Sequence, residues 1–255
     1  MTEVKDILVQ LTLPFYCHTS VARIVETQEE SATLGLVNGD FAKQDLLESV
    51  LDECKPPYAE GTEEQHYLLS TPFRYPPLKY GSRFGSTSMP SYFYASEKIN
   101  TVLAECAFYR LAFRADMVIP YEGNTTSEHM TFQIEIKTNN LADLTTIQQS
   151  DINDALRSPT NYSLTQDLGK VLIEEWGIEV IRFWSARCEG INVAVASPAV
   201  FVQEAPFDRH YWICTTSNTQ VQFKKKNLDY QNNRQFPVSF SITEFMIDGQ
   251  LPNLA

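Results

Sequence analysis

Residues 71–110 read TPFRYPPLKYGSRFGSTSMPSYFYASEKINTVLAECAFYR and change character twice along their length. A Pro- and Gly-rich loop comes first, the aromatic run of residues 91–95 reads as a strand, and Ser96 is a good N-cap for a following helix. The apolar residues of that helix recur with the spacing of a core-facing stripe: Ile99, Val102, Leu103, Cys106 and Ala107. The stretch therefore predicts loop, strand and helix in succession.

The rest of the chain mixes strands and helices without regular βαβ alternation, which favours the α+β class. Residues 131–138 (TFQIEIKT) alternate apolar and polar side chains, as a half-buried antiparallel strand does. Three further segments read as a helix ended by Gly177 and as two strands: residues 164–176, 178–183 and 191–196. Residues 210–246 hold two or three more strand-like runs.

Three regions are expected along the chain. Residues 1–66 are predicted to be a helical N-terminal extension, with one helix within residues 20–30 and a second helix capped by Asp40. The predicted core spans residues 67–205. Residues 206–255 are expected to form a β-rich C-terminal extension packed on that core.

The composition excludes several classes of protein. The formal net charge of -12 at pH 7 argues against direct nucleic-acid binding, because such proteins need a basic face to displace counterions from phosphates. No stretch approaches the roughly 20 apolar residues that cross a bilayer. Residues 1–16 carry acids where a secretory signal carries basic residues, so the cytoplasm is the expected location.

Residues that commonly bind metals are dispersed along the chain. The five cysteines never occur as CxxC, which favours reduced thiols. The four histidines share no ligand-like spacing: His18, His66, His129 and His210. The motifs GxGxxG, GxxxxGK[ST], HExxH and GxSxG are also missing. The sequence therefore predicts neither a metal site nor a Rossmann-type nicotinamide dehydrogenase.

Arg74 and Arg83 lie in a loop that prolines stiffen and glycines open to close backbone approach. A guanidinium fork matches phosphate oxygens, so the pair suits an anionic, phosphate-bearing ligand. Two solvated surface arginines are the alternative. The local sequence leaves both interpretations open.

Two side chains farther along suit either a site or a core. Tyr94 points the same way as Tyr92 in the predicted strand, and it either fills the core or stacks on a flat ring in a cleft. Glu105 falls at the flank of the apolar stripe, where an unpaired buried carboxylate is costly. Either it pairs with an arginine such as Arg83 or Arg110, or it serves a ligand.

Two serines complete the set of candidates. Ser163 opens a predicted helix, where capping is its simplest role. A capping serine at the edge of a cleft can also bond a ligand amide. Ser185, in the segment FWSAR, is a weaker candidate of the same kind.

Three segments together resemble the RES domain family, which is named for an arginine, a glutamate and a serine. They read FRYPPLKYGSRFG, FYASEKINTVLAE and NYSLTQDLG, and the resemblance covers roughly residues 67–200. It extends to GIEVIRFWSARCEGINVAVASPAVF, which is similar to the C-terminal strand pattern of the family. The family comprises toxins of bacterial toxin–antitoxin pairs, usually encoded beside a DNA-binding antitoxin of the Xre type.

The resemblance assigns family positions to the two loop arginines. Arg74, with Tyr75 beside it, matches the first family arginine. Arg83 matches the arginine of a Gly-Arg-Trp-Asn-like turn, in which Ser82 is inserted here and Phe84 replaces the tryptophan.

The same resemblance covers the remaining candidates. Tyr94 matches the tyrosine eleven residues before the family glutamate, and Glu105 matches that glutamate. Ser163 is our choice for the family serine, with Ser185 as the alternative.

The resemblance implies a fold similar to that of ADP-ribosyltransferases, with a split antiparallel sheet around an NAD cleft. It also implies destruction of NAD at the nicotinamide–ribose bond, with phosphate or water as acceptor, so that NAD is a substrate and no cofactor is expected. Glu105 would stabilise the positive charge that develops on the ribose. Arg74 and Arg83 would hold the pyrophosphate, Tyr94 would stack on nicotinamide or ribose, and the serine would bond the carboxamide or support Glu105.

Two other functions remain open at this point. One is a mono-ADP-ribosyltransferase that acts on a cytosolic protein, and the other is a catalytically weak module that binds a nucleotide or a partner protein. An Xre-type antitoxin is the implied protein partner, and the acidic surface is compatible with it. The sequence leaves a homo-oligomer open.

Overall fold

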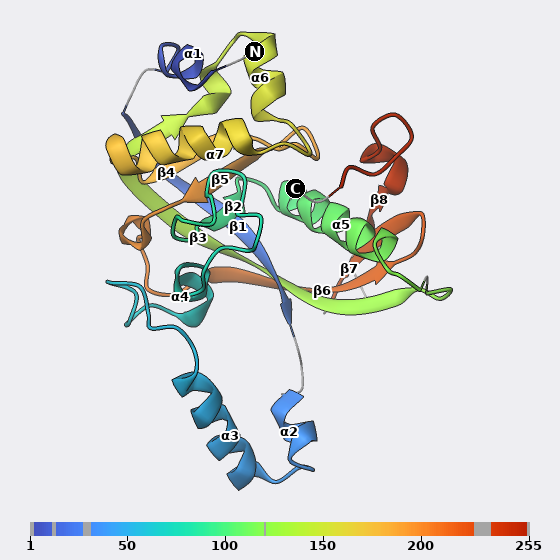
Figure 1. Cartoon of the computed structure of the whole chain (residues 1–255). Coiled ribbons are helices and arrows are strands. Elements are labelled where there is room, and N and C mark those ends of the chain that lie inside the picture. The colour runs from blue at the N-terminus through green and yellow to red at the C-terminus, as the bar shows by residue number, and fades with distance from the viewer. Residues whose placement is uncertain (1–2, 12–13, 28–31, 120, 227–235, 254–255) are drawn as a thin grey trace.

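The computed structural model describes residues 3–11, 14–27, 32–119, 121–226 and 236–253. In these ranges the strands form one mixed sheet in the order β1-β2-β5-β4-β3-β6-β7-β8, with helices on both faces (Figure 1). The strands are β1 Phe15–Thr27, β2 Phe93–Ser96, β3 Thr125–Asp143, β4 Val180–Trp184, β5 Ile191–Val195, β6 Phe207–Thr216, β7 Gln220–Lys225 and β8 Val238–Ser241. The predicted α+β class is confirmed, but the sheet is mixed and not wholly antiparallel as expected, because β4 runs parallel to β3.

The helices are distributed along the whole chain. The α-helices are α1 Val4–Leu8, α2 Ala32–Leu36, α3 Phe41–Glu53, α4 Tyr67–Arg74, α5 Ile99–Ala115, α6 Ser150–Leu156 and α7 Ser163–Lys170. Shorter 3-10 turns are Leu144–Thr146, Pro198–Val200 and Ile242–Glu244, and the π-helical segment Val171–Glu175 continues α7. No helix in the described ranges is both long and apolar enough to cross a membrane.

The first five strands pair in a closed circuit. β1 pairs with β3 along its whole length and meets β2 at the single pair Ala22 and Ser96. β5 then links β2 to β4, and β4 runs parallel to the end of β3. The strands β6, β7 and β8 continue the sheet from the other half of β3. The long strand β3 therefore joins the circuit to the C-terminal strands.

The prediction of a helix within residues 20–30 is wrong, because residues 15–27 form β1. Apolar side chains alternate there with period two: Val21 and Val25 pack on the cluster that contains α4, whereas Ile24 faces α5. The N-terminal region is therefore not only a helical extension, since it supplies a strand to the central circuit. The second predicted helix is present as α3, and the Asp40 carboxylate accepts a hydrogen bond from Lys43 N at its start.

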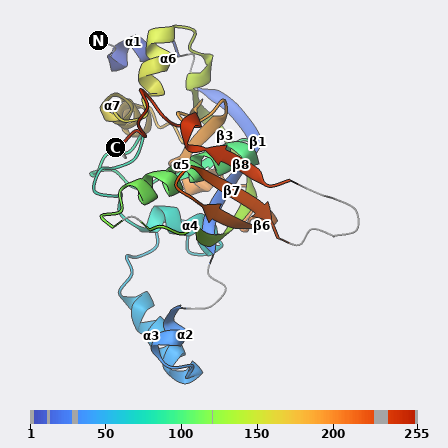
Figure 2. The ribbon, with the colours of Figure 1, turned by 90° about the vertical axis from the view of Figure 1, so that its right-hand side faces the viewer.

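The pair α2–α3 extends away from the rest of the molecule in two perpendicular views (Figures 1 and 2). None of the α3 side chains is buried. The chain returns from α3 to the sheet through α4, whose Leu68 and Leu69 are buried against the strands of the circuit. The helix α5 lies on the opposite face and packs on β6 and β7 (Figure 2).

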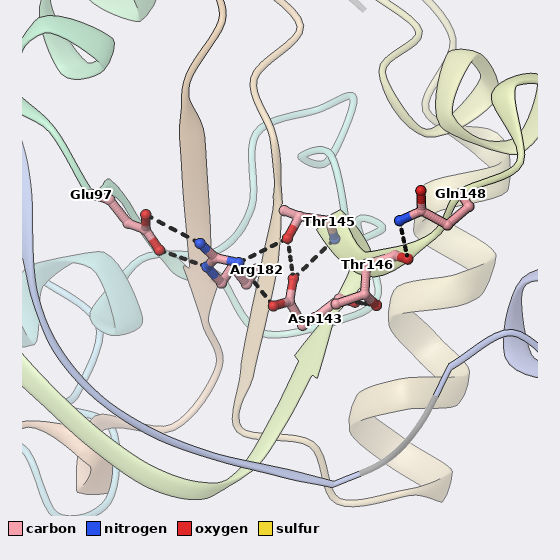
Figure 3. A network of polar contacts seen from close by, with 6 residues as sticks. All are labelled: Glu97, Asp143, Thr145, Thr146, Gln148 and Arg182. Atoms are coloured by element: carbon pink, nitrogen blue, oxygen red, sulfur yellow. Dashed lines mark hydrogen bonds and ion pairs between the residues drawn. The ribbon is translucent and has the colours of Figure 1, made fainter.

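An ion-pair network ties the middle of β4 to the ends of β2 and β3 (Figure 3). The Arg182 guanidinium on β4 donates to Glu97 Oε1 at 2.6 Å and to Asp143 Oδ2 at 2.8 Å. Its Nη1 also donates to Thr145 Oγ1 at 2.8 Å. A half-buried arginine between two carboxylates has its charge fully compensated, so this network fixes the ends of β2 and β3 against β4.

Candidate active site

Glu105 lies on α5, at the side of the apolar stripe that packs on β6 and β7, and is half-buried. Its carboxylate is held on one oxygen only. Ser185 Oγ donates to Glu105 Oε1 at 2.6 Å, and Asn192 Nδ2 donates to the same oxygen at 2.6 Å. The other oxygen, Oε2, has no hydrogen-bond partner among the described residues. The carboxylate is thus fixed in orientation and keeps one acceptor oxygen for a ligand.

A second layer of hydrogen bonds holds the two donors. Ser96 Oγ donates to Asn192 Oδ1 at 2.6 Å, which orients the Asn192 amide so that its NH2 group faces Glu105. Ser185 Oγ accepts from Arg187 N at 3.0 Å and from Cys188 N at 3.3 Å. Ser96, Ser185 and Asn192 are all buried, so this layer is rigid. The prediction of Ser96 as a helix N-cap is wrong: the strand β2 extends to Ser96, and Lys98 is the N-cap of α5.

The two candidate serines lie in different environments. Ser185 is fully buried and contacts Glu105 directly. Ser163 is exposed at the first residue of α7, and its hydroxyl donates to Asn161 Oδ1 at 2.7 Å. The preference for Ser163 over Ser185 is therefore not supported by the geometry, since only Ser185 reaches the carboxylate. The helix register and the Asn161 side chain explain the difference, because together they turn Ser163 toward the surface.

Two buried guanidinium groups lie around the 156–162 segment. Arg83 donates from Nη1 to Leu156 O at 2.9 Å and from Nη2 to Ser158 O at 3.1 Å, and it lies 4.4 Å from the centre of the Tyr162 ring. Arg187 donates to Pro159 O at 2.9 Å.

Arg187 also covers the Phe108 ring on α5, at 3.4 Å from its centre. Neither Arg83 nor Arg187 forms an ion pair with a carboxylate in the described ranges. Two buried positive charges without an acidic partner suit an anionic ligand.

Tyr94 supports the loop that carries Arg83. Its hydroxyl donates to Ser82 Oγ at 2.9 Å and accepts from Phe84 N at 3.1 Å, so it fixes both neighbours of Arg83. Burial raises the pKa of Tyr94 to about 12, which keeps the hydroxyl a donor at neutral pH. The turn also needs Gly81, whose φ of 73° is left-handed and whose added Cβ would lie 2.4 Å from Gly85 O.

Arg74 and Tyr75 do not join this cluster. Arg74 donates to Pro56 O at 2.5 Å, lies 3.5 Å from Asp52 Oδ1 and covers the Tyr58 ring at 4.1 Å. Tyr75 is exposed. The predicted role of Arg74 and Tyr75 in substrate binding is therefore not supported by their placement, because α4 turns both toward the segment that follows α3.

The pKa of the Tyr109 hydroxyl depends on several of the candidate residues. Tyr109 is 47% exposed as a whole residue, but partial burial of its hydroxyl raises the pKa of that group, and nearby Tyr162 and Glu105 raise it further. The guanidinium groups of Arg187 and Arg83 lower it in turn. One carboxylate, two guanidinium groups and two tyrosines thus lie close enough to influence one another across the surface of α5.

Several residues of this cluster were missed by the sequence reasoning. Asn192 gave a signal, since an asparagine is unusual within the apolar strand INVAV. Arg187 had no sequence signal other than its position two residues after Ser185 in the segment FWSAR. No group of three or more His, Cys, Asp or Glu side chains suited to a metal ion occurs in the described part of the chain.

The comparison with protein families agrees with the motifs around this cluster. The model of the RES domain matches residues 58–216, more than half of the chain. The chain belongs to the RES domain family. The match includes β6 and so extends beyond the predicted core at residues 67–205, whose boundaries stay a prediction.

Among solved structures, the RES-domain chain is similar to one in the "Crystal structure of the M.tuberculosis MbcT-MbcA toxin-antitoxin complex". The identity is 12%, the alignment covers 94% of this chain and 92% of that chain, and the TM-score is 0.42. No curated protein matches the chain.

Proposed function

We propose that this RES-domain chain is an NAD-consuming enzyme that cleaves the bond between ribose C1′ and the nicotinamide nitrogen. The observation that carries the proposal is the Glu105 carboxylate, which is held on one oxygen, unpaired on the other among the described residues, and accompanied by two buried guanidinium groups without acidic partners. This set of charges matches a dinucleotide that carries a pyrophosphate and develops positive charge on its sugar.

The chemistry explains why one carboxylate suffices. The nicotinamide nitrogen of NAD is cationic, so the electrons of the breaking bond neutralise it and the ring leaves without a proton. The ribose becomes an oxocarbenium-like cation, which the free oxygen of Glu105 would stabilise. An oxygen of phosphate then bonds to C1′ to give ADP-ribose 1″-phosphate, or water does so and releases a proton with ADP-ribose.

The other residues of the cluster have supporting roles in this proposal. Arg83 and Arg187 would hold the pyrophosphate or the incoming phosphate. Tyr109 or Tyr162 would offer the aromatic face that was expected of Tyr94, while Tyr94 positions the Arg83 loop. The ADP-ribosyltransferase-like arrangement around an NAD cleft belongs to the same proposal.

The biological role follows from the family. We infer that the chain acts as a toxin of a toxin–antitoxin pair, with an Xre-type antitoxin as its partner. The net charge of -12 is compatible with a partner that carries a basic DNA-binding domain.

The deciding experiment uses the purified full-length chain, NAD, and buffers with and without phosphate. Loss of NAD together with free nicotinamide is the expected result. ADP-ribose 1″-phosphate in phosphate buffer identifies a phosphorylase, and ADP-ribose in both buffers identifies a glycohydrolase. Label transferred from NAD to an added cytosolic protein, without free ADP-ribose, would instead support the mono-ADP-ribosyltransferase. Unchanged NAD would leave the nucleotide-binding module as the better description.

A further inference from the structure

A groove of about 330 Å³ lies between β1 and α4. It is on the face of the sheet opposite to Glu105. Arg23 stands in register with Phe132 of the α4-side core. In contrast, Asn192 on β5, which donates to Glu105, and its partner Ser96 on β2 project from the other face. Its volume is within the range of small-molecule sites, at about 300–1,000 Å³. The groove is therefore separate from the candidate active site.

Arg23 is the only cation that lines this groove in the described ranges. One of its N–H groups, on Nη1, donates to Tyr94 O at 2.9 Å, and the guanidinium lies 4.7 Å from the centre of the Phe93 ring. No carboxylate pairs with it among the described residues, and burial lowers its pKa to about 10. A guanidinium with this pKa is still charged at neutral pH, so a largely buried charge stands here without a counter-ion.

Arg182 provides the contrast on the same face of the sheet. Its guanidinium is also largely enclosed, but Glu97 and Asp143 neutralise it. The acid Glu26 also lines the groove. Its carboxylate, however, pairs with Arg110 on α5 at 3.1 Å. Two acids thus neutralise Arg182, whereas the acid that lines the groove pairs with Arg110 rather than with Arg23.

We propose that the groove between β1 and α4 binds a small organic anion whose carboxylate or phosphate pairs with the Arg23 guanidinium. The apolar part of the ligand would rest on Val25, Leu68 and Pro72, which line the same groove. The hydroxyl groups of Tyr67 and Thr71 are further hydrogen-bond partners along the α4 wall.

Arg23 also has a structural role, because its bond to Tyr94 O bridges β1 and β2 beside their single residue pair. That bridge uses one of the five N–H donors of the guanidinium. A charge is not needed to bridge two strands, since a neutral amide would do so at lower desolvation cost. The bridge alone therefore does not explain an arginine at a groove.

The test measures binding by calorimetric titration and ligand-observed NMR on the full-length chain. The probes are benzoate and phenyl phosphate, with neutral benzyl alcohol as the matched control, because it keeps the ring and lacks both the charge and the carboxamide of nicotinamide. We expect both anions to bind and benzyl alcohol to bind at least about tenfold more weakly. Tighter binding of either anion identifies the preferred acidic group. Equal binding of benzoate and benzyl alcohol, or no binding of either anion, would overturn the proposal.

Two variants locate the binding. Arg23→Gln removes the charge and should weaken benzoate binding at least about tenfold, whereas Lys137→Gln removes an exposed charge on β3 and should not. Thr71→Trp fills the groove from its exposed α4 wall while Arg23 itself stays unsubstituted, and it decides the matter if Arg23→Gln does not fold. Wild-type affinity in Thr71→Trp would show that the anion binds elsewhere. Because NAD turnover is not the readout, this result is independent of the proposed function.

Discussion

At the scale of single residues, Glu105 is the side chain on which the proposed chemistry depends. Its Oε1 is held by Ser185 and Asn192, so Glu105→Gln should preserve the fold while it removes the charge that, in this proposal, stabilises the ribose. We expect the turnover of NAD to fall by about 10²–10³-fold with little change in KM. Glu64→Gln, at an exposed position, is the matched control. Wild-type turnover in the Glu105 variant would show that the carboxylate has no electrostatic role in the reaction.

The two serines make a second matched pair. Ser185→Ala removes a hydrogen bond to a carboxylate inside a buried network, and such bonds contribute about 1.5–3 kcal/mol. We expect a loss of that size in the free energy of unfolding, and a slower turnover because Glu105 is no longer oriented. Ser163→Ala, on the surface, should stay within about 0.5 kcal/mol of wild type. Denaturant unfolding and NAD assays check both, and a greater effect of Ser163→Ala on turnover would reverse the assignment.

Substitutions of the two loop arginines should likewise differ in their effect on KM. Arg83→Lys keeps the charge but loses the fork that also holds Leu156 O and Ser158 O, so KM for NAD should rise about tenfold or more. Arg74→Lys should leave KM unchanged and lower only the stability, because its contacts lie near Tyr58. Steady-state kinetics of the two variants side by side distinguish them. An increase in KM for Arg74→Lys alone would mean that Arg74, and not Arg83, binds the pyrophosphate.

The residue types of the site were predictable from sequence, but their grouping was only partly so. Glu105, an isolated acid in an apolar stripe, and Arg83, an arginine in a Pro- and Gly-rich loop, were candidates on local grounds, and the family resemblance selected them. The choice between Ser163 and Ser185 depends on strand pairing, which brings Ser185 to Glu105 across 80 positions of chain. Local capping signals cannot reveal such a contact, so the more obvious helix-start serine was preferred.

At the scale of elements, the site depends on how closely the turn before β5 approaches α5. An added Cβ at Gly190 would lie 2.2 Å from Thr101 Oγ1 and 2.9 Å from Thr101 Cβ, and Gly190 O accepts from Ser185 N at 2.8 Å. Gly190→Ala should therefore push this turn, and Ser185 with it, away from Glu105. We expect turnover to fall by about 10²-fold, as for other small displacements of a positioned group.

Gly35→Ala is the control for that substitution. Gly35 lies in α2 with no atom within 4 Å of an added Cβ, so alanine there should be neutral or slightly stabilising. Turnover assays and thermal unfolding of both variants provide the measurement. Full activity in Gly190→Ala would mean that the turn can move without disturbing the carboxylate.

Element prediction succeeded where one periodicity dominates. The stripe on α5 and the alternation in β3 are long and regular, and both elements are present. β1 was missed because its mixed segment TSVARIVET places Arg23 on the α4 side, where an apolar residue is expected of a strand. The same arginine that obscured the alternation is the one that lines the groove. A residue that interrupts the apolar alternation of a strand, as Arg23 does, can thus also indicate a candidate site.

At the scale of the whole molecule, the C-terminal strands are part of one continuous sheet. A β-rich extension packed on the core was expected, and β6 pairs with β3 from Thr125 to Gln133. Strand order is not readable from one sequence, because pairing partners such as β3 and β6 are set by tertiary contacts rather than by local propensity. The cluster between α5 and the strands β6 and β7 shows the consequence: the helix that bears Glu105 is held in place by residues beyond position 206.

Removal of one buried ring tests this dependence. Phe223 on β7 is fully buried and meets His129 and Phe240 edge to face, so Phe223→Ala should cost about 3–5 kcal/mol of unfolding free energy. Phe236 is 86% exposed, and Phe236→Ala should stay within about 0.5 kcal/mol of wild type. Denaturant melts with the NAD assay run in parallel measure both quantities. Because α5 packs on the Phe223 cluster, we expect Phe223→Ala to lower activity and stability together, and full stability in that variant would separate the C-terminal strands from the core.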